Sequence, residues 1–363
     1  MSGLVPLREI ERELKQRMQA LQGESGAAFQ RARMSNLIVF CDSLQRSIEL
    51  NDDVPALSSV HPARTLLLVG EPGADRPLTA RVIVRPLPRQ GSSTGACVEM
   101  VTLHGGGCIV ERLPFAVRSL LIGDLPVNLL WASTIAPPLA GVLMHELAEP
   151  AQQIIYDSIG WPDPIRGVLA TAAWLEKIER TGVRWRVASD LNWRRLKFWR
   201  RLLSQTLLAY QAAAPSDASL CEIAIEHGPH ASIQAWLLAS WLADSLQATP
   251  QGGRVTPGVE MTWQFRGPRG EMQVHIRRRE QGPATVQCVR LGCLPHPLIV
   301  SRESPQRLSV QHQHGDSTPR TVTVPALSMA DMIGRQLNDR ERDRRFCQAM
   351  RTAQAMAQAV AGG

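Results

Sequence analysis

The pattern of hydrophobic and polar positions predicts alternating strands and helices over residues 35–160. Short apolar runs bounded by Gly, Pro or charged residues are typical of buried strands. Strands that alternate with helices predict an α/β domain with a mostly parallel sheet. A polar link at 51–62 is expected after the first helix of this domain. The predicted strands are SNLIVFCD (35–42), TLLLVG (65–70), ARVIVRP (80–86), CVEMVTLHG (97–105), LPVNLLWAS (125–133) and IIYDSI (154–159).

The segments on either side of this domain have other patterns. Residues 4–22 carry an apolar stripe at helical spacing, so residues 1–34 are expected to form an amphipathic helix and a linker. That helix packs either on the body of the protein or against a second chain. WPDPIRG at 161–167 has two prolines within four residues, which predicts an interruption and the start of a second domain, 161–363.

The second domain is predicted to be α+β with an antiparallel sheet. A helix ending at Glu179, a strand at 183–189, a tryptophan-rich helix and a helix at 231–246 come first, with a loop at 214–219. Alternating runs then predict an antiparallel meander. Ser328, with Asp331 three residues on, predicts the start of the final helices. The meander strands are MTWQFRG (261–267), MQVHIRRRE (272–280), ATVQCVRL (284–291), LIVSRES (298–304), RLSVQHQH (307–314) and RTVTVPAL (320–327).

Residues 189–208, SDLNWRRLKFWRRLLSQTLL, predict a helix with one aromatic and one basic side. Ser189 or Asp190 offers a side-chain oxygen to the unpaired N–H groups of the first turn. Trp193, Trp199 and several leucines recur at helical spacing on one side. Such a helix buries its indoles and turns its cations to water or to an acidic partner. These cations are Arg194, Lys197, Arg200 and Arg201, with Arg195 near the boundary.

The composition is that of an ordinary folded protein with a small basic excess. Of the 363 residues, 44% are hydrophobic and 20% charged, and the formal net charge is +7. This excess is too small to imply nucleic-acid binding by itself. It favours an acidic protein partner over a basic one. The apolar runs are too short to span a membrane, and the N-terminus lacks the order of a signal peptide. Because the seven cysteines are scattered, we expect a cytoplasmic protein with reduced thiols.

The sequence offers no complete catalytic, cofactor or metal motif. Neither Gly-x-Gly-x-x-Gly after a strand nor Gly-Lys-Ser/Thr occurs, so no nucleotide cofactor is predicted. HGGGC at 104–108 resembles an esterase oxyanion loop, but we expect no nucleophile elbow and therefore predict a tight turn there. Glu149 stands where a zincin begun by His145 would need its second His. Asp157 follows a buried strand, and we expect it to cap a helix or pair with an arginine.

Five segments of the chain follow the order of one family pattern. Residues 190–203, DLNWRRLKFWRRLL, match Asp-Leu-x-Trp-x-Arg-x-x-x-Trp-Arg. The other four are HPARTLLL (61–68), DLPVNLLW (124–131), QQIIYDSIG (152–160) and ASIQAWLLASWLADSL (231–246). In these segments the chain resembles the glucose-6-phosphate dehydrogenase assembly protein family (OpcA-like). The resemblance covers most of the chain after residue 35 and is weakest in the last third.

The resemblance implies a non-catalytic protein that binds glucose-6-phosphate dehydrogenase. Such proteins are understood to promote the active oligomer of that enzyme in the oxidative pentose phosphate pathway. The family signature here consists of Asp190, Trp193 and Trp199, which are expected to have a structural role. The basic side of the same helix is the predicted partner-binding surface. Its members are Arg194, Arg195, Lys197, Arg200 and Arg201.

Two cysteines are candidates for redox control. Cyanobacterial members of the family are regarded as thioredoxin-linked switches, which makes thioredoxin a second implied partner. Cys288 and Cys293 lie five positions apart, and Gly292 between them would let the chain turn back toward disulfide distance. Arg290 would favour a thiolate. The alternative is two unpaired strand cysteines, with Cys347 as the next candidate.

A different function class remains open from the sequence alone. The chain would then bind or convert a phosphorylated sugar, with Arg64, Arg76 or Arg85 holding the phosphate. No general base or nucleophile can be named for that reaction. Turnover of a sugar phosphate by the chain alone would distinguish this alternative.

Overall fold

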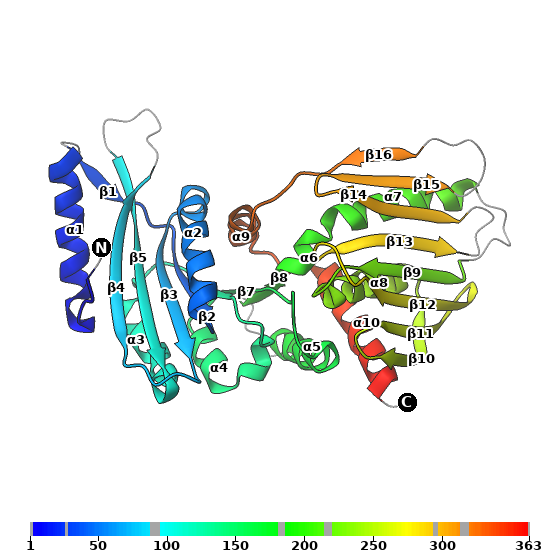
Figure 1. Ribbon diagram of the computed structural model, residues 1–363, viewed down its shortest axis with the longest axis horizontal. Helices are drawn as coiled ribbons and strands as arrows, with labels where there is room; N and C mark the ends of the chain where they lie inside the picture. The colour runs from blue at the N-terminus through cyan, green and yellow to red at the C-terminus, as the bar shows by residue number, and fades with distance from the viewer. Residues whose placement is uncertain are drawn as a thin grey trace.

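Two eight-stranded sheets lie side by side along the long axis of the molecule (Figure 1). The computed structural model describes residues 3–25, 28–87, 95–180, 186–213, 220–292, 297–312 and 319–361. The N-terminal sheet is mostly parallel and carries helices on both faces. The C-terminal sheet is mostly antiparallel and carries helices on one face. The predicted fold class, an α/β unit followed by an α+β unit, is confirmed.

The first sheet has the strand order β1-β5-β3-β2-β6-β7-β8, with β4 antiparallel to β5 at one side. The neighbours along this path are parallel, and the strand order reverses between β2 and β6, as in dinucleotide-binding folds. Because helices cover both faces, the central strands are mostly apolar, and buried polar residues such as Asn36, Arg64 and Asn128 lie near their amino ends. The strands are β1 (Phe29–Arg31), β2 (Ser35–Cys41), β3 (Ala63–Glu71), β4 (Thr79–Pro86), β5 (Gly95–Gly106), β6 (Val127–Trp131), β7 (Gln153–Tyr156) and β8 (Val187–Asp190).

Helices from both ends of the chain cover this sheet. Helix α1 packs on the body through Ile10 and Leu14, which are both fully buried. The expected polar link at 51–62 is wrong, because α2 continues to Val60 and buries Leu57 against the sheet. The helices of this unit are η1 (Leu7–Glu9), α1 (Ile10–Ser25), α2 (Leu44–Val60), η2 (Gly107–Arg112), α3 (Leu113–Leu120), η3 (Pro137–Ala140), α4 (Val142–Ala148) and α5 (Pro164–Arg180).

The second sheet has the order β10-β11-β12-β9-β13-β14-β15-β16. The predicted meander is wrong at one point, because β9 inserts between β12 and β13 and runs parallel to β12. Ile223 and Ile225 of β9 face the core, which is why the sheet includes this strand. The strands are β9 (Glu222–His227), β10 (Thr249–Thr256), β11 (Glu260–Gly267), β12 (Gly270–Arg278), β13 (Val286–Gly292), β14 (Leu298–Ser304), β15 (Arg307–His312) and β16 (Arg320–Thr323).

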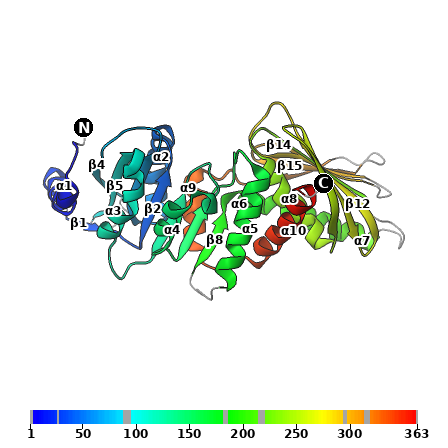
Figure 2. The ribbon, with the colours of Figure 1, turned by 90° about the horizontal axis from the view of Figure 1, so that it is seen from below.

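The covered face of the second sheet packs on α7 (Lys197–Ala213), α8 (Ser232–Ser245) and α10 (Arg344–Ala361) (Figure 2). Helix α8 is buried on all sides between the sheet and α10. Trp236 of α8 lies 5.1 Å from Trp263 of β11, measured between ring centroids. The indole N–H of Trp263 donates to the carbonyl oxygen of Met356 at 2.9 Å, which fixes α10 on the sheet.

The two units interlock beyond the predicted boundary. The strand expected at 183–189 in the second domain is β8, which pairs in parallel with β7 and completes the first sheet. The prolines of 161–167 misled the prediction, because Pro164 is the first residue of α5 and proline is well tolerated there. Near the end of the chain, α9 (Met329–Asn338) returns to the first sheet beside α2.

Candidate functional site

The carboxyl ends of β7 and β8 are joined by a buried network built around Asp190. This residue ends β8 and caps the short helix α6 (Leu191–Arg195), accepting from the backbone N–H of Asn192 at 2.8 Å. Its other carboxylate oxygen accepts from the hydroxyl of Ser158 at 2.5 Å. Burial, and then the nearby charge of Asp157, raise the pKa of Asp190 to about 7. Asp190 therefore holds the two strand ends together.

Arg195 and Asp157 form a two-pronged ion pair beside this network. Nη1 of Arg195 lies 2.7 Å from Oδ1 of Asp157, and Nη2 lies 2.7 Å from Oδ2. Nη1 also donates to Oδ1 of Asn192 at 2.9 Å. The side chains of Arg195 and Asp157 are only 17% and 8% exposed. The prediction that Asp157 pairs with an arginine is confirmed, and Arg195 faces the protein interior.

The predicted helix at 189–208 is two helices. Helix α6 ends at Arg195, Leu196 forms the junction, and α7 starts at Lys197. Trp193 and Trp199 are both buried, one on each side of this junction. The indole N–H of Trp193 donates to Asp343 at 2.7 Å. The signature tryptophans therefore anchor two helices in different parts of the core.

The signature cations have different environments. Arg194 donates from Nε to Gln336 at 2.7 Å and from Nη2 to Asp339 at 3.0 Å. Its guanidinium is therefore paired with the last turn of α9 and with the residue that follows this helix. The guanidinium carbon of Arg200 lies 3.3 Å from the ring centroid of Trp193. Lys197 and Arg201 are exposed. The expected solvated basic side is therefore wrong for Arg194 and Arg195, because the end of the chain and β7 supply their partners.

A cleft of about 170 Å³ lies between α6–α7 and the connection from α9 to α10. Figure 1 shows these elements meeting between the two sheets. Three of the five predicted partner-binding cations line it, together with the signature Asp190 and Trp193. The remaining lining comes mainly from the C-terminal part of the chain. The lining residues are Ser189, Asp190, Trp193, Arg194, Lys197, Arg200, Gln336, Asp339, Glu341, Asp343 and Phe346.

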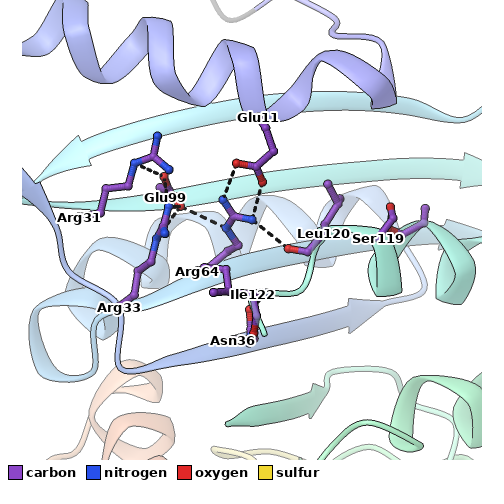
Figure 3. A network of polar contacts seen from close by, with 10 residues as sticks. Glu11, Arg31, Arg33, Asn36, Arg64, Glu99, Ser119, Leu120 and Ile122 are labelled. Carbon is purple, nitrogen blue, oxygen red and sulfur yellow. Dashed lines mark hydrogen bonds and ion pairs between the residues drawn. The ribbon is translucent and has the colours of Figure 1, made fainter. Parts of the chain in front are cut away.

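Arg64, the first phosphate-binding candidate, lies in a different network. Figure 3 shows Arg31, Arg33 and Arg64 converging on Glu99, whose side chain is 1% exposed. Nη1 of Arg64 also bonds to Glu11 of α1 at 2.6 Å. These contacts tie α1 to the amino ends of the strands, away from the carboxyl edge where such folds bind ligands.

The carboxyl edge of the first sheet is occupied by the protein's own polar groups. Asp42, after β2, accepts from the hydroxyl of Ser133, after β6, at 2.5 Å. Glu71 lies 2.6 Å from Nε2 of His104 and 3.5 Å from Nε of Arg76. Carboxylates at these strand ends oppose a phosphate group, because like charges repel at short range. Of the other two phosphate-binding candidates, Arg76 is paired here, and Arg85 lies on β4 and is partly exposed.

The tight turn predicted at His104–Gly107 is wrong, because strand β5 continues to Gly106 and the 3-10 helix η2 starts at Gly107. Gly107 has a φ of +55°, and the β3–β4 loop crosses directly above Gly106. The sequence GSSTG at 91–95 does match Gly-x-Ser-x-Gly, so the expectation that the chain has no such motif is wrong. This segment joins the antiparallel strands β4 and β5, whereas a nucleophile elbow joins a strand to a helix. Residues 88–94 lie outside the described ranges.

The described residues also include two of the redox candidates, Cys288 and Cys347. No group of three metal-binding side chains occurs within the described residues. Cys288 is a free cysteine, so of the two alternatives for this residue the unpaired one holds and the candidate disulfide with Cys293 does not form. Cys293, like the loop expected at 214–219, lies outside the described ranges. Cys221, which was not among the candidates, is disulfide-bonded. Burial, followed by Glu226, raises the pKa of Cys288, and burial and Glu179 raise that of Cys347 to about 11.

Comparison with known proteins adds the decisive observation. Residues 54–173 match the model described as "Glucose-6-phosphate dehydrogenase subunit N-terminal domain", and residues 186–350 match the corresponding C-terminal domain. The chain belongs to the OpcA family. The C-terminal match includes all the residues that line the cleft. The family resemblance expected from the five segments is thereby confirmed.

Curated OpcA relatives are longer than this chain. A "Putative OxPP cycle protein OpcA" from Nostoc punctiforme is 32% identical over 193 residues, 52% of this chain and 39% of that protein. Its namesake from Synechocystis is 27% identical over 248 residues, 66% of this chain and 49% of that protein. The chain therefore matches less than half the length of these OpcA relatives.

Solved structures of similar fold include a levoglucosan dehydrogenase in complex with NADH and L-sorbose. It is 12% identical, with a TM-score of 0.49 over 91% of this chain and 98% of that one. Biliverdin reductase from Synechocystis is 9% identical, with a TM-score of 0.47 over 90% and 99% of the two chains. Within the described ranges, no helix of this OpcA-family chain has the length and apolar character needed to cross a bilayer.

Proposed function

We propose that the chain is a non-catalytic partner of glucose-6-phosphate dehydrogenase that binds the enzyme and promotes its active oligomeric state. The observation that carries this proposal is the match of both parts of the chain to models of a glucose-6-phosphate dehydrogenase subunit. As an effector, the chain has to bind the active state of the enzyme more tightly than the inactive one. A difference of about 1–3 kcal/mol corresponds to a roughly 5- to 150-fold change in affinity.

The contacts of the candidate reactive groups support a binding role. Asp157 is neutralised by Arg195, and Arg64 by Glu11 and Glu99, so these groups serve the fold. A sugar-phosphate enzyme would need such groups free to meet its substrate. The second candidate function, binding or conversion of a sugar phosphate, therefore lacks a specific supporting contact.

The proposed contact surface includes the cations of α6 and α7. Arg194 and Arg195 already have carboxylate partners inside the protein. Lys197 and Arg201 are exposed on the first turns of α7, and Arg200 lines the cleft. The members of the predicted surface whose charge is available for a partner are therefore Lys197, Arg200 and Arg201.

Co-purification and mass photometry test the proposed complex. Tagged chain is mixed with untagged glucose-6-phosphate dehydrogenase from the same organism, and the masses present are recorded with and without the chain. We expect the enzyme to be retained and its distribution to move toward the larger, active oligomer. Failure to retain the enzyme at micromolar concentrations of both proteins contradicts the proposal. Turnover of glucose 6-phosphate by the chain alone would support the second candidate instead.

Thioredoxin-linked redox control is a further part of the proposal with less structural support. Cys288 and Cys347 are disfavoured as thiolates because burial raises the pKa of both thiols. Repeating the co-purification after reduction by thioredoxin and after oxidation tests this part separately. Equal retention of the dehydrogenase in both conditions would remove redox control and leave the binding proposal intact.

A further inference from the structure

Cys221 is disulfide-bonded, and the state of the other cysteines narrows down its partner. The chain has seven cysteines, of which the structure describes six. The free cysteines among the described residues are Cys41, Cys97, Cys108, Cys288 and Cys347. The cysteine that remains is Cys293, which lies outside the described ranges and follows Gly292 directly in the sequence. A bond within this chain therefore leaves Cys293 as the candidate partner of Cys221.

The register of β9 and β13 leads from Cys221 to the residue that follows Gly292. These neighbouring strands run antiparallel, and their last two pairs are Ile223 with Leu291 and Glu222 with Gly292. Continued by one position, the same register pairs residue 221 with residue 293. The backbone N–H of Cys221 also donates to the carbonyl oxygen of Gly292 at 3.4 Å. The two segments are therefore still adjacent at Cys221, one position before β9 begins.

Strand alternation separates Cys288 from this pair of positions. Ile223 and Leu291 pair with each other and are fully buried under the helices that cover one face of the sheet. Residues 221 and 293 lie two positions from them, so the alternation assigns both to the covered face. Cys288 lies three positions from Leu291, so its side chain belongs to the uncovered face. A bond from Cys288 to either of these positions would have to cross the sheet, which explains why Cys288 is free.

The spacing of antiparallel strands suits a disulfide between directly opposite residues. Such residues have Cα atoms roughly 4.5–5.5 Å apart. A disulfide needs a Cα separation of roughly 4.4–6.8 Å, so the bond forms without moving the strands. Cys221 is partly exposed, so a small thiol or disulfide in solution can reach the site.

We propose that Cys221 and Cys293 form a disulfide that joins the start of β9 to the chain directly after β13. The bond closes a ring of chain that contains α8 and strands β9 to β13, which include the centre of the second sheet (Figure 1). Oxidised glutathione serves as the oxidant. One cysteine thiolate attacks its S–S bond and releases the first glutathione thiol, and the other cysteine then displaces the second from the mixed disulfide. Two electrons and two protons thus pass from the cysteines to glutathione. This inference does not depend on the proposed function, because it requires no dehydrogenase.

Peptide mapping tests the pairing, because trypsin separates the three cysteines concerned. Cleavage after arginines places Cys221 in peptide 202–254, Cys288 in peptide 280–290 and Cys293 in peptide 291–302. The full chain is treated with oxidised glutathione, its free thiols are blocked with N-ethylmaleimide in denaturant, and it is digested without reductant. We expect peptides 202–254 and 291–302 to be joined, and peptide 280–290 to carry the label. A cross-link that includes peptide 280–290, or label on both Cys221 and Cys293, overturns the proposal.

Serine variants provide a second, independent measurement. Reduction should lower the Tm of the oxidised wild-type chain by about 5 °C, because the bond restricts the unfolded chain. Cys221→Ser and Cys293→Ser lack the bond, so their Tm should not respond to the reductant, and circular dichroism checks that both variants are folded. Cys288→Ser is the matched control and should keep the wild-type shift. A shift in Cys221→Ser as large as that of the wild type contradicts the pairing.

Discussion

The ion pair between Arg195 and Asp157 leads to a specific stability prediction. Arg195→Met removes the charge but keeps a long side chain that still packs beside α6. Asp157 then stays in a site where its side chain is 8% exposed, close to Asp190 and without its two bonds of 2.7 Å. The variant therefore leaves an uncompensated carboxylate inside the protein.

The size of the effect follows from that unpaired charge. Removing one member of a buried pair costs about 3–5 kcal/mol. Asp157 keeps one bond, from the backbone N–H of Ile159 at 3.2 Å, which offsets part of the loss. We therefore expect a loss of about 3 kcal/mol in the free energy of unfolding. The double variant Asp157→Asn/Arg195→Met removes both charges of the pair, and it should recover about 2 kcal/mol of this.

Urea unfolding, followed by tryptophan fluorescence and circular dichroism, measures these differences. Lys197→Met is the control, since Lys197 is exposed two residues further along, and it should change stability by less than about 0.5 kcal/mol. A loss below about 1 kcal/mol in Arg195→Met would refute the reasoning from buried charge. A double variant as unstable as the single one would refute it as well.

Three further changes test other parts of the structure. Glu99→Gln leaves Arg64 and its neighbours around a neutral group, so we expect the free energy of unfolding to fall by about 3–5 kcal/mol. The loss is measured as a lower Tm, and an unchanged Tm would contradict the network of Figure 3. Because the folded pKa of Asp190 is raised to about 7, its stabilising effect is complete below about pH 4 and is lost as the pH rises toward 7. Asp190→Asn should lack this decline, and parallel Tm curves would disprove the assignment. Gly106→Ala places a Cβ 2.1 Å from the carbonyl oxygen of Ala74, so the β3–β4 loop has to move away. We expect this loop to become more sensitive to protease, and a variant that is cleaved at the wild-type rate would argue against a closed loop.

Much of the parallel sheet follows from local pattern. The strand around Leu66 is a continuous apolar run between turn signals, and both of its faces are covered in the fold. The capping box of Ser328 and Asp331 also begins α9 as predicted. The pairing of Asp157 with an arginine is one of the two alternatives that the sequence left open, the other being a helix cap. For the strand and the capping box, the local sequence is sufficient to predict the observed element.

The environment of the signature helix does not follow from local pattern. Helical spacing places Arg194 on the polar side, but its partners Gln336 and Asp339 are more than a hundred residues away in the sequence. The chain breaks into two helices at Leu196, but Trp193 and Trp199 are both buried and Lys197 is exposed, as a single helical projection predicts. The insertion of β9 into the second sheet depends in the same way on contacts that α8 and β12 supply.

An activity titration tests the proposed function most directly. The initial rate of glucose 6-phosphate oxidation by glucose-6-phosphate dehydrogenase is measured at a substrate concentration below its KM while the wild-type chain is added to saturation. We predict a saturable rise in rate, with a half-saturation point that shifts to higher concentration for Lys197→Glu. A rate that stays constant at saturating chain, with both proteins folded, would contradict the proposal that this protein activates the dehydrogenase.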